Sequence, residues 1–377
     1  MTTHAESDGW AEAPVPKLSD PTDLLTALPA LMGFVPSRSL VIVCLSGTGP
    51  SFTLGPTMRH DLAPPTVAHR VHPVMVEVVK KLAELCERED ILQAIAVIVD
   101  DTDDVERAIA SSTSTAYGIT HPCDYEALDD HVLLMDVVDA ILNEYGTELR
   151  SAHIVGRIET DAPWASFFGD TRRGVLTDHR SAPVTLATVV GGKAIRGSRE
   201  EIERLLDPAP EDVRTMVETA IDLAATRAAE RTDLECMQLV LNLVQTDRIS
   251  PYGPMEIAET AWAVERIAVR DMLLALAITT VSDQAQQLWI AVTRAVPEAD
   301  RATAATLLGF FSYVRGEGPL AGTAFAAALT SQPDHNFASL LDTALMNAMR
   351  PDFVREVARN AYDDLVELGI ALPPTVG

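Results

Sequence analysis

Residues 23–45 read Asp-Leu-Leu-Thr-Ala-Leu-Pro-Ala-Leu-Met-Gly-Phe-Val-Pro-Ser-Arg-Ser-Leu-Val-Ile-Val-Cys-Leu. The leucines of the first part recur at helical spacing, and Gly33 is suited to the left-handed conformation that ends many helices. Pro29 lies inside this segment, so we expect one kinked helix or two short pieces. Ser39–Leu45 is almost continuously apolar, which is typical of a strand covered on both faces. The stretch therefore predicts a central strand entered through a short helix.

Further strand and helix patterns alternate up to Asp207. A turn around Gly47 and Gly49 is followed by a return strand from Ser51 to Leu54. Two more apolar runs indicate buried strands, Ile91–Val99 and Ser151–Ile158. This alternation predicts an α/β domain, with a mixed sheet and helices packed on it. We place it at residues 18–207, after a flexible N-terminal tail at residues 1–17.

The remaining chain, residues 208–377, shows helical periodicity only, and the Pro-rich segment 207–210 marks the boundary. This second half contains a repeat: Ala285, Trp289, Val292 and Pro297 recur 36 residues later as Ala321, Phe325, Ala328 and Pro333. With Gly309 and Gly316, the second copy has the spacing of the tetratricopeptide repeat, a helical hairpin. The first copy departs from the pattern at Leu273 and Thr280. We expect an all-α, tetratricopeptide-like domain with hairpins near residues 266–299 and 302–335.

The first helix of each hairpin would line an inner groove in such a repeat. By spacing, this face presents Arg270 and Leu274 from one copy and Phe310 and Tyr313 from the other. Exposed aromatic side chains beside an arginine would form a surface for a protein partner. The alternative is that all four side chains pack against the α/β domain.

The densest acidic group of the first half directly follows the apolar run at residues 91–99 and reads Asp100-Asp101-Thr102-Asp103-Asp104. Acids between a strand and a helix are typical magnesium ligands in parallel-sheet enzymes, which gives Asp100, Asp101 and Asp103 as an alternative metal site. In the simpler interpretation these residues cap the following helix and meet its positive end. No cofactor is predicted outside the magnesium alternative.

The composition limits the classes of function. The chain has 55 acidic and 29 basic residues, a net charge of −26, which opposes direct nucleic-acid binding and is compatible with basic partners, although solubility alone would also explain it. Scattered cysteines, no apolar run long enough for a membrane span and no secretory signal indicate a reduced, cytoplasmic protein. Zinc-helix, paired-cysteine and nucleophile-elbow motifs are not found in the sequence.

Four segments together resemble one family: residues 24–43, Trp164-Ala165-Ser166, Gly197-Ser198-Arg199-Glu200 and Gly316-Glu317-Gly318-Pro319-Leu320-Ala321. The chain is similar, from about residue 20 to 350, to the actinobacterial family catalogued as domain of unknown function 4192. Many members carry cysteines after the tryptophan, whereas residues 167–173 have none here. The resemblance implies an intracellular protein of an actinobacterium or an actinobacteriophage, and it carries no established activity.

These observations favour a non-catalytic adaptor or regulator whose helical half binds a protein partner. A metal-assisted hydrolase or transferase using Asp100–Asp104 is the alternative, and an acidic mimic of DNA that binds a basic protein is a further one. A homo-oligomer is compatible with the sequence. We interpret Ser37-Arg38-Ser39, just before the first buried strand, as structural.

Overall fold

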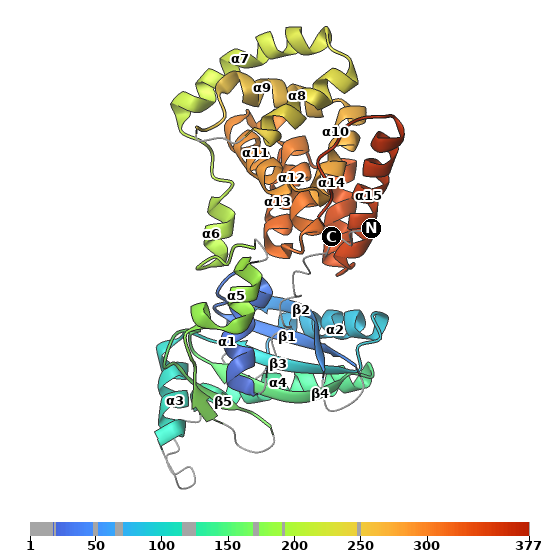
Figure 1. Cartoon of the computed structure of the whole chain (residues 1–377). Helices are drawn as coiled ribbons and strands as arrows, with labels where there is room; N and C mark the ends of the chain where they lie inside the picture. The colour runs from blue at the N-terminus through green and yellow to red at the C-terminus, as the bar shows by residue number, and fades with distance from the viewer. Residues whose placement is uncertain are drawn as a thin grey trace, which may run out of the picture. The chain divides into compact units, whose positions relative to one another are not determined.

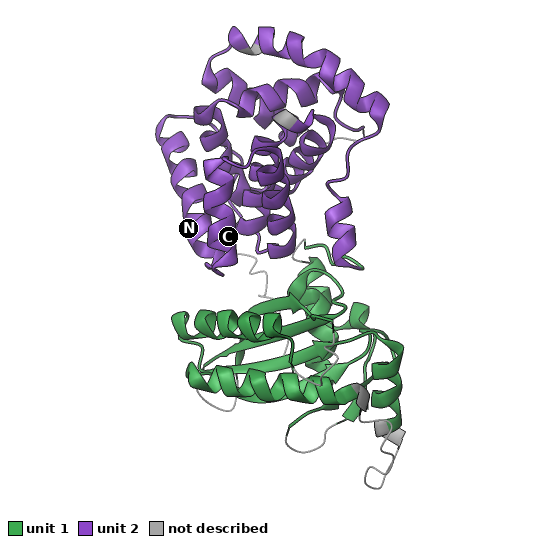
Figure 2. Cartoon of the chain, turned by 180° about the vertical axis from the view of Figure 1, so that it is seen from behind, with its two compact units in different colours: residues 1–197 green, residues 198–377 purple. Residues whose placement is uncertain are grey.

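The structure is a computed structural model that describes residues 18, 20–47, 52–64, 71–114, 126–168, 173–190, 193–246 and 250–376. The predicted tail at residues 1–17 lies outside these residues. Contacts within the chain define two compact units, residues 1–197 (unit 1) and residues 198–377 (unit 2), coloured separately in Figure 2. Each unit is described by itself.

Unit 1 is built on one mixed sheet with the strand order β2-β1-β3-β4-β5-β6 (Figure 1). Strands β3 and β4 are parallel, and every other neighbouring pair is antiparallel. This confirms the predicted mixed sheet with helices. The strands are β1 (Ser39–Ser46), β2 (Thr53–Asp61), β3 (Gln93–Val99), β4 (Glu148–Val155), β5 (Pro163–Ser166) and β6 (Arg173–Val175).

Strand β1 is covered on both faces, as its sequence predicts, but it lies second from one edge of the sheet and not at its centre. Every residue from Ser39 to Leu45 is buried, and the strand lies between β2 and β3. Its antiparallel pairing with β2 confirms a hairpin after Ser46. The return strand is longer than expected and extends to Asp61.

Helix α1 (Pro21–Met32) precedes β1. The Asp20 carboxylate accepts a hydrogen bond from the backbone N–H of Asp23 at 3.0 Å and caps its first turn. Gly33 ends the helix with a φ of 79°, and its N–H donates to the carbonyl of Pro29. Pro29 lies within one continuous helix, so a division into two pieces is wrong.

Helices cover both faces of the sheet (Figures 1 and 2). The buried faces of α2 (Pro73–Arg88), α3 (Asp103–Ser114) and α4 (Glu126–Glu144) share one apolar core with alternate residues of β1, β3 and β4. Helix α1 and α5 (Pro183–Val190), which contact each other, lie on the opposite face, and a short 3-10 helix, η2 (His179–Ser181), precedes α5.

Unit 2 is helical throughout its described residues, apart from one isolated β-bridge. Its helices are α6 (Arg199–Arg204), α7 (Glu211–Ala229), α8 (Asp233–Gln245), α9 (Pro254–Val264), α10 (Ile267–Leu273), η3 (Leu274–Ile278), α11 (Ser282–Ala295), η4 (Glu298–Asp300), α12 (Ala302–Val314), α13 (Gly318–Ser331), α14 (Asn336–Met346) and α15 (Pro351–Glu367). No helix in the described part of the chain is long and apolar enough to cross a membrane.

Helices α12 and α13 pack closely because Gly309 has no side chain. A Cβ atom at Gly309 would lie 2.2 Å from the ring of Phe325, so the phenyl ring occupies the space that any larger residue would need. The preceding pair is less regular, because α10 gives way to the 3-10 helix η3 before α11. The likeness to a tetratricopeptide repeat stays a prediction.

The boundary between the two units follows residue 197, which is earlier in the chain than the boundary predicted after residue 207. Helix α6 belongs to unit 2, and the segment that follows it is tied to the same unit by hydrogen bonds. Arg294 donates from Nε to the carbonyl of Asp207, and Arg301 donates from Nη2 to the carbonyl of Leu206. The prolines of residues 207–210 therefore mark a packed turn and not a free connection.

Residues 374–376 return to the middle of unit 2 after α15. The N–H of Val376 donates to the carbonyl of Ile278 at 2.8 Å, and the N–H of Thr280 donates to the carbonyl of Pro374 at 2.9 Å. Thr279 and Thr375 form an antiparallel bridge between these bonds.

Candidate functional site at the carboxyl edge of the sheet

Four strands of unit 1 meet at one edge of the sheet. The register pairs Ser39, the first residue of β1, with both Asp61 of β2 and Val99 of β3, and pairs Val99 with Val155 of β4. The residues directly before β1 and directly after β2, β3 and β4 are therefore neighbours. We call this the carboxyl edge, because the parallel strands β3 and β4 both end there, the usual place for ligand sites in α/β sheets.

Asp100 is the most enclosed charged residue of this edge, with 4% of its surface exposed. Its Oδ1 accepts hydrogen bonds from Nη1 of Arg38 at 2.8 Å and from the backbone N–H of Thr102 at 3.2 Å. Its Oδ2 lies 2.9 Å from Nε2 of His131 on α4. Both carboxylate oxygens are therefore satisfied, as a buried charge requires.

These partners keep the carboxyl group ionised. Burial by itself raises the pKa of Asp100, but the hydrogen bond and charge of His131, the charge of Arg38 and the N–H of Thr102 together lower it to about 2. Because the carboxylate can only accept, Nε2 of His131 carries the proton in this contact. Nδ1 has no partner among the described residues, so it is the ring atom that can gain or lose a proton: it accepts when the ring is neutral and carries a proton when the ring is charged.

Arg38 adopts a backbone conformation that is unusual for a residue with a side chain. Its φ is 43°, in the left-handed region. Its carbonyl accepts from the N–H of Leu62 at 2.8 Å, and its side chain bonds to Asp100, so both ends of the residue are fixed. About a third of the side chain is exposed. Only Nη1 has a partner within the described residues, which leaves the remaining guanidinium donors unused.

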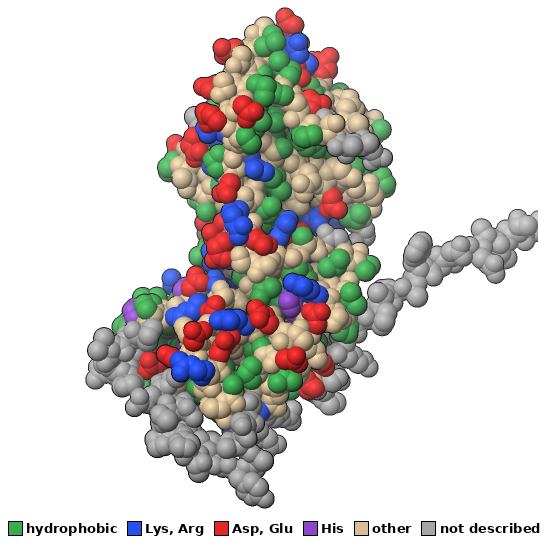
Figure 3. Space-filling model, turned by 90° about the vertical axis from the view of Figure 1, so that its left-hand side faces the viewer, with side chains coloured by type: hydrophobic (Ala, Val, Ile, Leu, Met, Phe, Trp, Pro, Cys, Tyr) green, Lys and Arg blue, Asp and Glu red, His purple; other side chains and the backbone are tan. Residues whose placement is uncertain are grey.

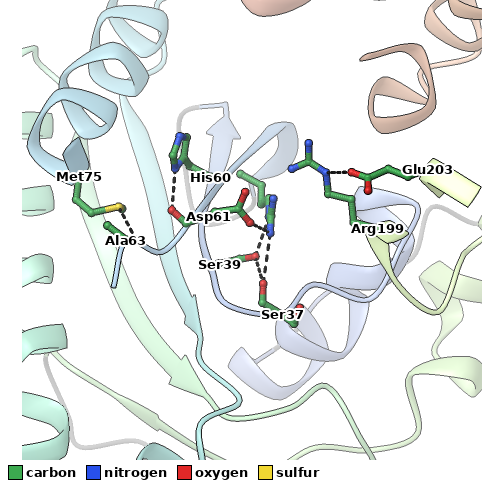
Figure 4. A network of polar contacts seen from close by, with 9 residues as sticks. Ser37, Ser39, His60, Asp61, Ala63, Met75, Arg199 and Glu203 are labelled. Carbon is green, nitrogen blue, oxygen red and sulfur yellow. Dashed lines mark hydrogen bonds and ion pairs between the residues drawn. The ribbon is translucent and has the colours of Figure 1, made fainter. Parts of the chain in front are cut away.

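A second arginine holds the β1–β2 side of the edge (Figure 4). Arg59 donates from Nε to the Oγ of Ser39 at 2.7 Å and from Nη2 to the carbonyl of Ser37 at 3.3 Å, and it pairs with Asp61. Its guanidinium also lies over the ring of Phe34, 5.8 Å from the centroid. These contacts use the donors of Arg59 to fix the entry to β1. Arg199 and Glu203, drawn in the same view, pair with each other on α6 of unit 2.

The β4 side of the edge carries a third arginine. Nε of Arg157 lies 3.3 Å from Glu106, and Nη2 lies 3.6 Å from Asp103, both on α3. Gly156 allows this approach, because a Cβ atom there would lie 2.3 Å from Cγ of Glu106. Acidic and basic side chains are accordingly mixed on the face of unit 1 drawn in Figure 3.

The acids predicted as magnesium ligands separate into different roles. Asp100 turns inward to Arg38 and His131, whereas the side chain of Asp103 is exposed and faces Arg157. The carbonyl of Asp101 accepts from Arg157 at 3.4 Å. Within the described residues, no three His, Cys, Asp or Glu side chains are grouped to hold a metal. The magnesium alternative therefore has no ligand set in this part of the chain.

The groove expected from the repeat needs a correction. Leu274, Phe310 and Tyr313 are 4%, 0% and 2% exposed and belong to the core of unit 2. Arg270 lies over the ring of Phe337 at 4.8 Å and pairs with Asp271. All four side chains are engaged within unit 2, so they do not line the open groove that the repeat predicts.

The physical reason is helix α15, which the repeat pattern did not include. It packs against η3, α10 and α12, the helices that would line the groove, while α13 and α14 flank α12. The inner face of the hairpins is therefore filled by the chain itself.

Two residues of the carboxyl edge were not predicted as site residues. Arg38 lies in the segment that we interpret as structural from the sequence, and His131 lies in an amphipathic helix with no motif around it. The only signal was the position of Ser37-Arg38-Ser39 before a buried strand.

Comparison with known proteins agrees with the resemblance of the sequence. The profile of the family described as domain of unknown function DUF4192 matches residues 21–352. The chain belongs to this family. The match to the DUF4192 family includes the whole carboxyl edge and all of unit 2 up to the start of α15. No curated protein and no solved structure matches the chain.

Proposed function

We propose that unit 1 binds a small molecule through an anionic group at the carboxyl edge and exchanges a proton with it, as a hydrolase or a transferase does. The observation that carries the proposal is the buried carboxylate of Asp100, held between Arg38 and His131. Each partner keeps hydrogen-bonding atoms that no described residue uses. Perturbed, buried charges of this kind are typical of functional sites.

Arg38 supplies the binding group. The guanidinium donors that no described residue uses are suited to a phosphate or carboxylate, which accept two parallel N–H bonds from arginine. Asp100 holds the guanidinium in place through Nη1. The strained backbone of Arg38 fits this role. Such a conformation persists only where the surrounding structure holds it, and residues of this kind cluster at active sites and ligand-binding sites.

His131 supplies the acid–base group. Asp100 fixes the ring through Nε2 and so leaves Nδ1 as the atom that accepts and returns a proton. An aspartate that orients a histidine in this way also stabilises the imidazolium after proton transfer. The proposal keeps the reaction class of the magnesium alternative, but it makes Asp100 the positioning residue for Arg38 and His131 and not a metal ligand.

An ion pair that only fastens α4 to the sheet is the competing explanation. Buried ion pairs contribute little net stability, because the cost of removing both charges from water offsets their attraction. A purely structural pair therefore gives no reason to keep two charges and a strained arginine at this position. The two explanations predict different effects of substituting Arg38 and His131 on anion binding and on turnover.

The test is isothermal titration of inorganic phosphate and of citrate into the full chain, together with hydrolysis of p-nitrophenyl phosphate and p-nitrophenyl acetate. We expect Arg38→Gln to weaken anion binding about tenfold or more. His131→Gln keeps a donor for Asp100, so it should retain binding but lower turnover by about a hundredfold.

Arg107→Gln is the matched control, because the described partners of this exposed arginine are Asp103 and Asp104 of its own helix α3. It should change neither binding nor turnover. If the wild-type chain binds no anion, and Arg38→Gln and His131→Gln change only the melting temperature, the edge is structural and the proposal fails.

A further inference from the structure

The adaptor expected from the sequence requires a surface other than the predicted groove, whose residues are buried. Helix α7 offers one, independently of the site in unit 1. Its inner side packs on α9 through small residues, with Ala220 and Ala224 against Ala258. Its outer side leaves Met216 and Leu223 49% and 47% exposed.

These two side chains form one stripe on the helix. They are seven residues apart, two helical turns, so they lie almost directly above one another along the helix axis. Because α7 has 19 residues, its outer side is long enough for several turns of a second helix to lie along it.

The charge of α7 determines what kind of helix fits. Asp212, Glu218 and Asp222 have no ion-pair partner among the described residues, and no basic residue lies between Arg214 and Arg227. These two arginines are neutralised by Glu211 and Glu259. On the face of unit 2 drawn in Figure 3, hydrophobic side chains lie among acidic ones.

We propose that the outer side of α7 is a docking surface for a basic amphipathic helix of a partner protein. Met216 and Leu223 bind the apolar side of that helix, and Asp212 and Asp222, which flank this stripe, pair with its lysines or arginines. Helix-in-groove recognition uses anchors at this spacing. A second copy of this chain is a poor occupant, because two surfaces with the same unpaired acids repel each other.

The experiment measures fluorescence anisotropy of a labelled peptide of about 18 residues, long enough for five helical turns. The peptide carries leucines on one face and lysines on the other, and its twin has glutamates in place of the lysines. We expect the full chain to bind the basic peptide and not the acidic twin. Raising the salt from about 50 mM to about 500 mM should weaken binding, because the paired charges are exposed.

Two variants of α7 separate the contribution of the apolar anchors to peptide binding from that of the acidic side chains. Met216→Ser with Leu223→Ser removes the anchors and should weaken binding about tenfold or more. Asp212→Asn with Asp222→Asn should mainly reduce the dependence on salt.

The matched control is Val366→Ser with Leu368→Ser, which removes two exposed apolar side chains at the end of α15. It should bind the basic peptide like the wild type. Equal loss in the control and in the anchor variant would overturn the proposal, as would equal binding of the acidic twin or no binding at all. Self-association that disappears in the anchor variant would identify a second copy as the occupant and would also overturn it.

Discussion

Replacing Asp100 with asparagine removes the negative charge that Arg38 and His131 share, and the cost of this change should depend on pH. Burial raises the pKa of Asp100, but His131, Arg38 and the Thr102 N–H outweigh this effect and lower it from 3.8 to about 2. The difference, multiplied by 1.36 kcal/mol per unit, corresponds to about 2 kcal/mol of stability.

The sign follows from the direction of the shift. Because the folded protein holds this proton less tightly than the unfolded chain, the contribution is present above about pH 4 and is lost as the pH falls to about 2. The amide introduced by the substitution does not titrate, so Asp100→Asn should destabilise unit 1 strongly at pH 6. At pH 2.5 the cost should be smaller by about 1.5 kcal/mol.

Hydrogen exchange read by mass spectrometry can report on unit 1 separately, through the backbone amides of β3 in a urea series. Asp352→Asn is the control, because Asp352 is an exposed acid that pairs with Arg355 within α15. Asp352→Asn should lower the free energy of unfolding only slightly at either pH. A cost of Asp100→Asn that is the same at pH 6 and pH 2.5 would refute the electrostatic account of the carboxyl edge.

Three further predictions concern packing, backbone conformation and the ionisation of a buried tyrosine. Gly309→Ala should lower the stability of unit 2 by about 1–3 kcal/mol, because the new methyl group meets the ring of Phe325, whereas Gly318→Ala has room and should be tolerated in the same melting experiment. Gly33→Ala should cost about 1 kcal/mol in urea unfolding, entirely through its positive φ, since no atom lies within 4 Å of the added carbon. Burial raises the pKa of Tyr313 to about 12, so stability should fall between about pH 10 and pH 12 in the wild type. In Tyr313→Phe this loss should be absent from alkaline unfolding curves.

Local sequence patterns were sufficient to predict much of the secondary structure of unit 1. Ser39–Leu45 predicted a doubly covered strand because its apolar run is continuous, and Gly33 predicted a helix end because glycine adopts positive φ easily. The mixed sheet followed from the alternation of such segments. These are properties of neighbouring residues, which the sequence shows directly.

Pairings between distant residues could not be predicted in the same way. Asp100 was singled out because an acid between a strand and a helix is a local signal. Its partners Arg38 and His131 lie 62 and 31 residues away, and only the register of the sheet and the docking of α4 bring them to it. The predicted groove failed for a related reason: the burial of Phe310 depends on where α15 packs, which the repeat spacing does not contain.

The bridge between Thr279 and Thr375 also affects when unit 2 can finish folding. During synthesis, residues 278–280 leave the ribosome long before residues 374–376, so their backbone hydrogen bonds must wait for nearly a hundred further residues. The core around η3 is incomplete for the whole of that interval, since α15 also arrives late. Chaperone contact with the nascent chain should therefore concentrate on η3 and α12, and it should end only once residues 374–376 have emerged.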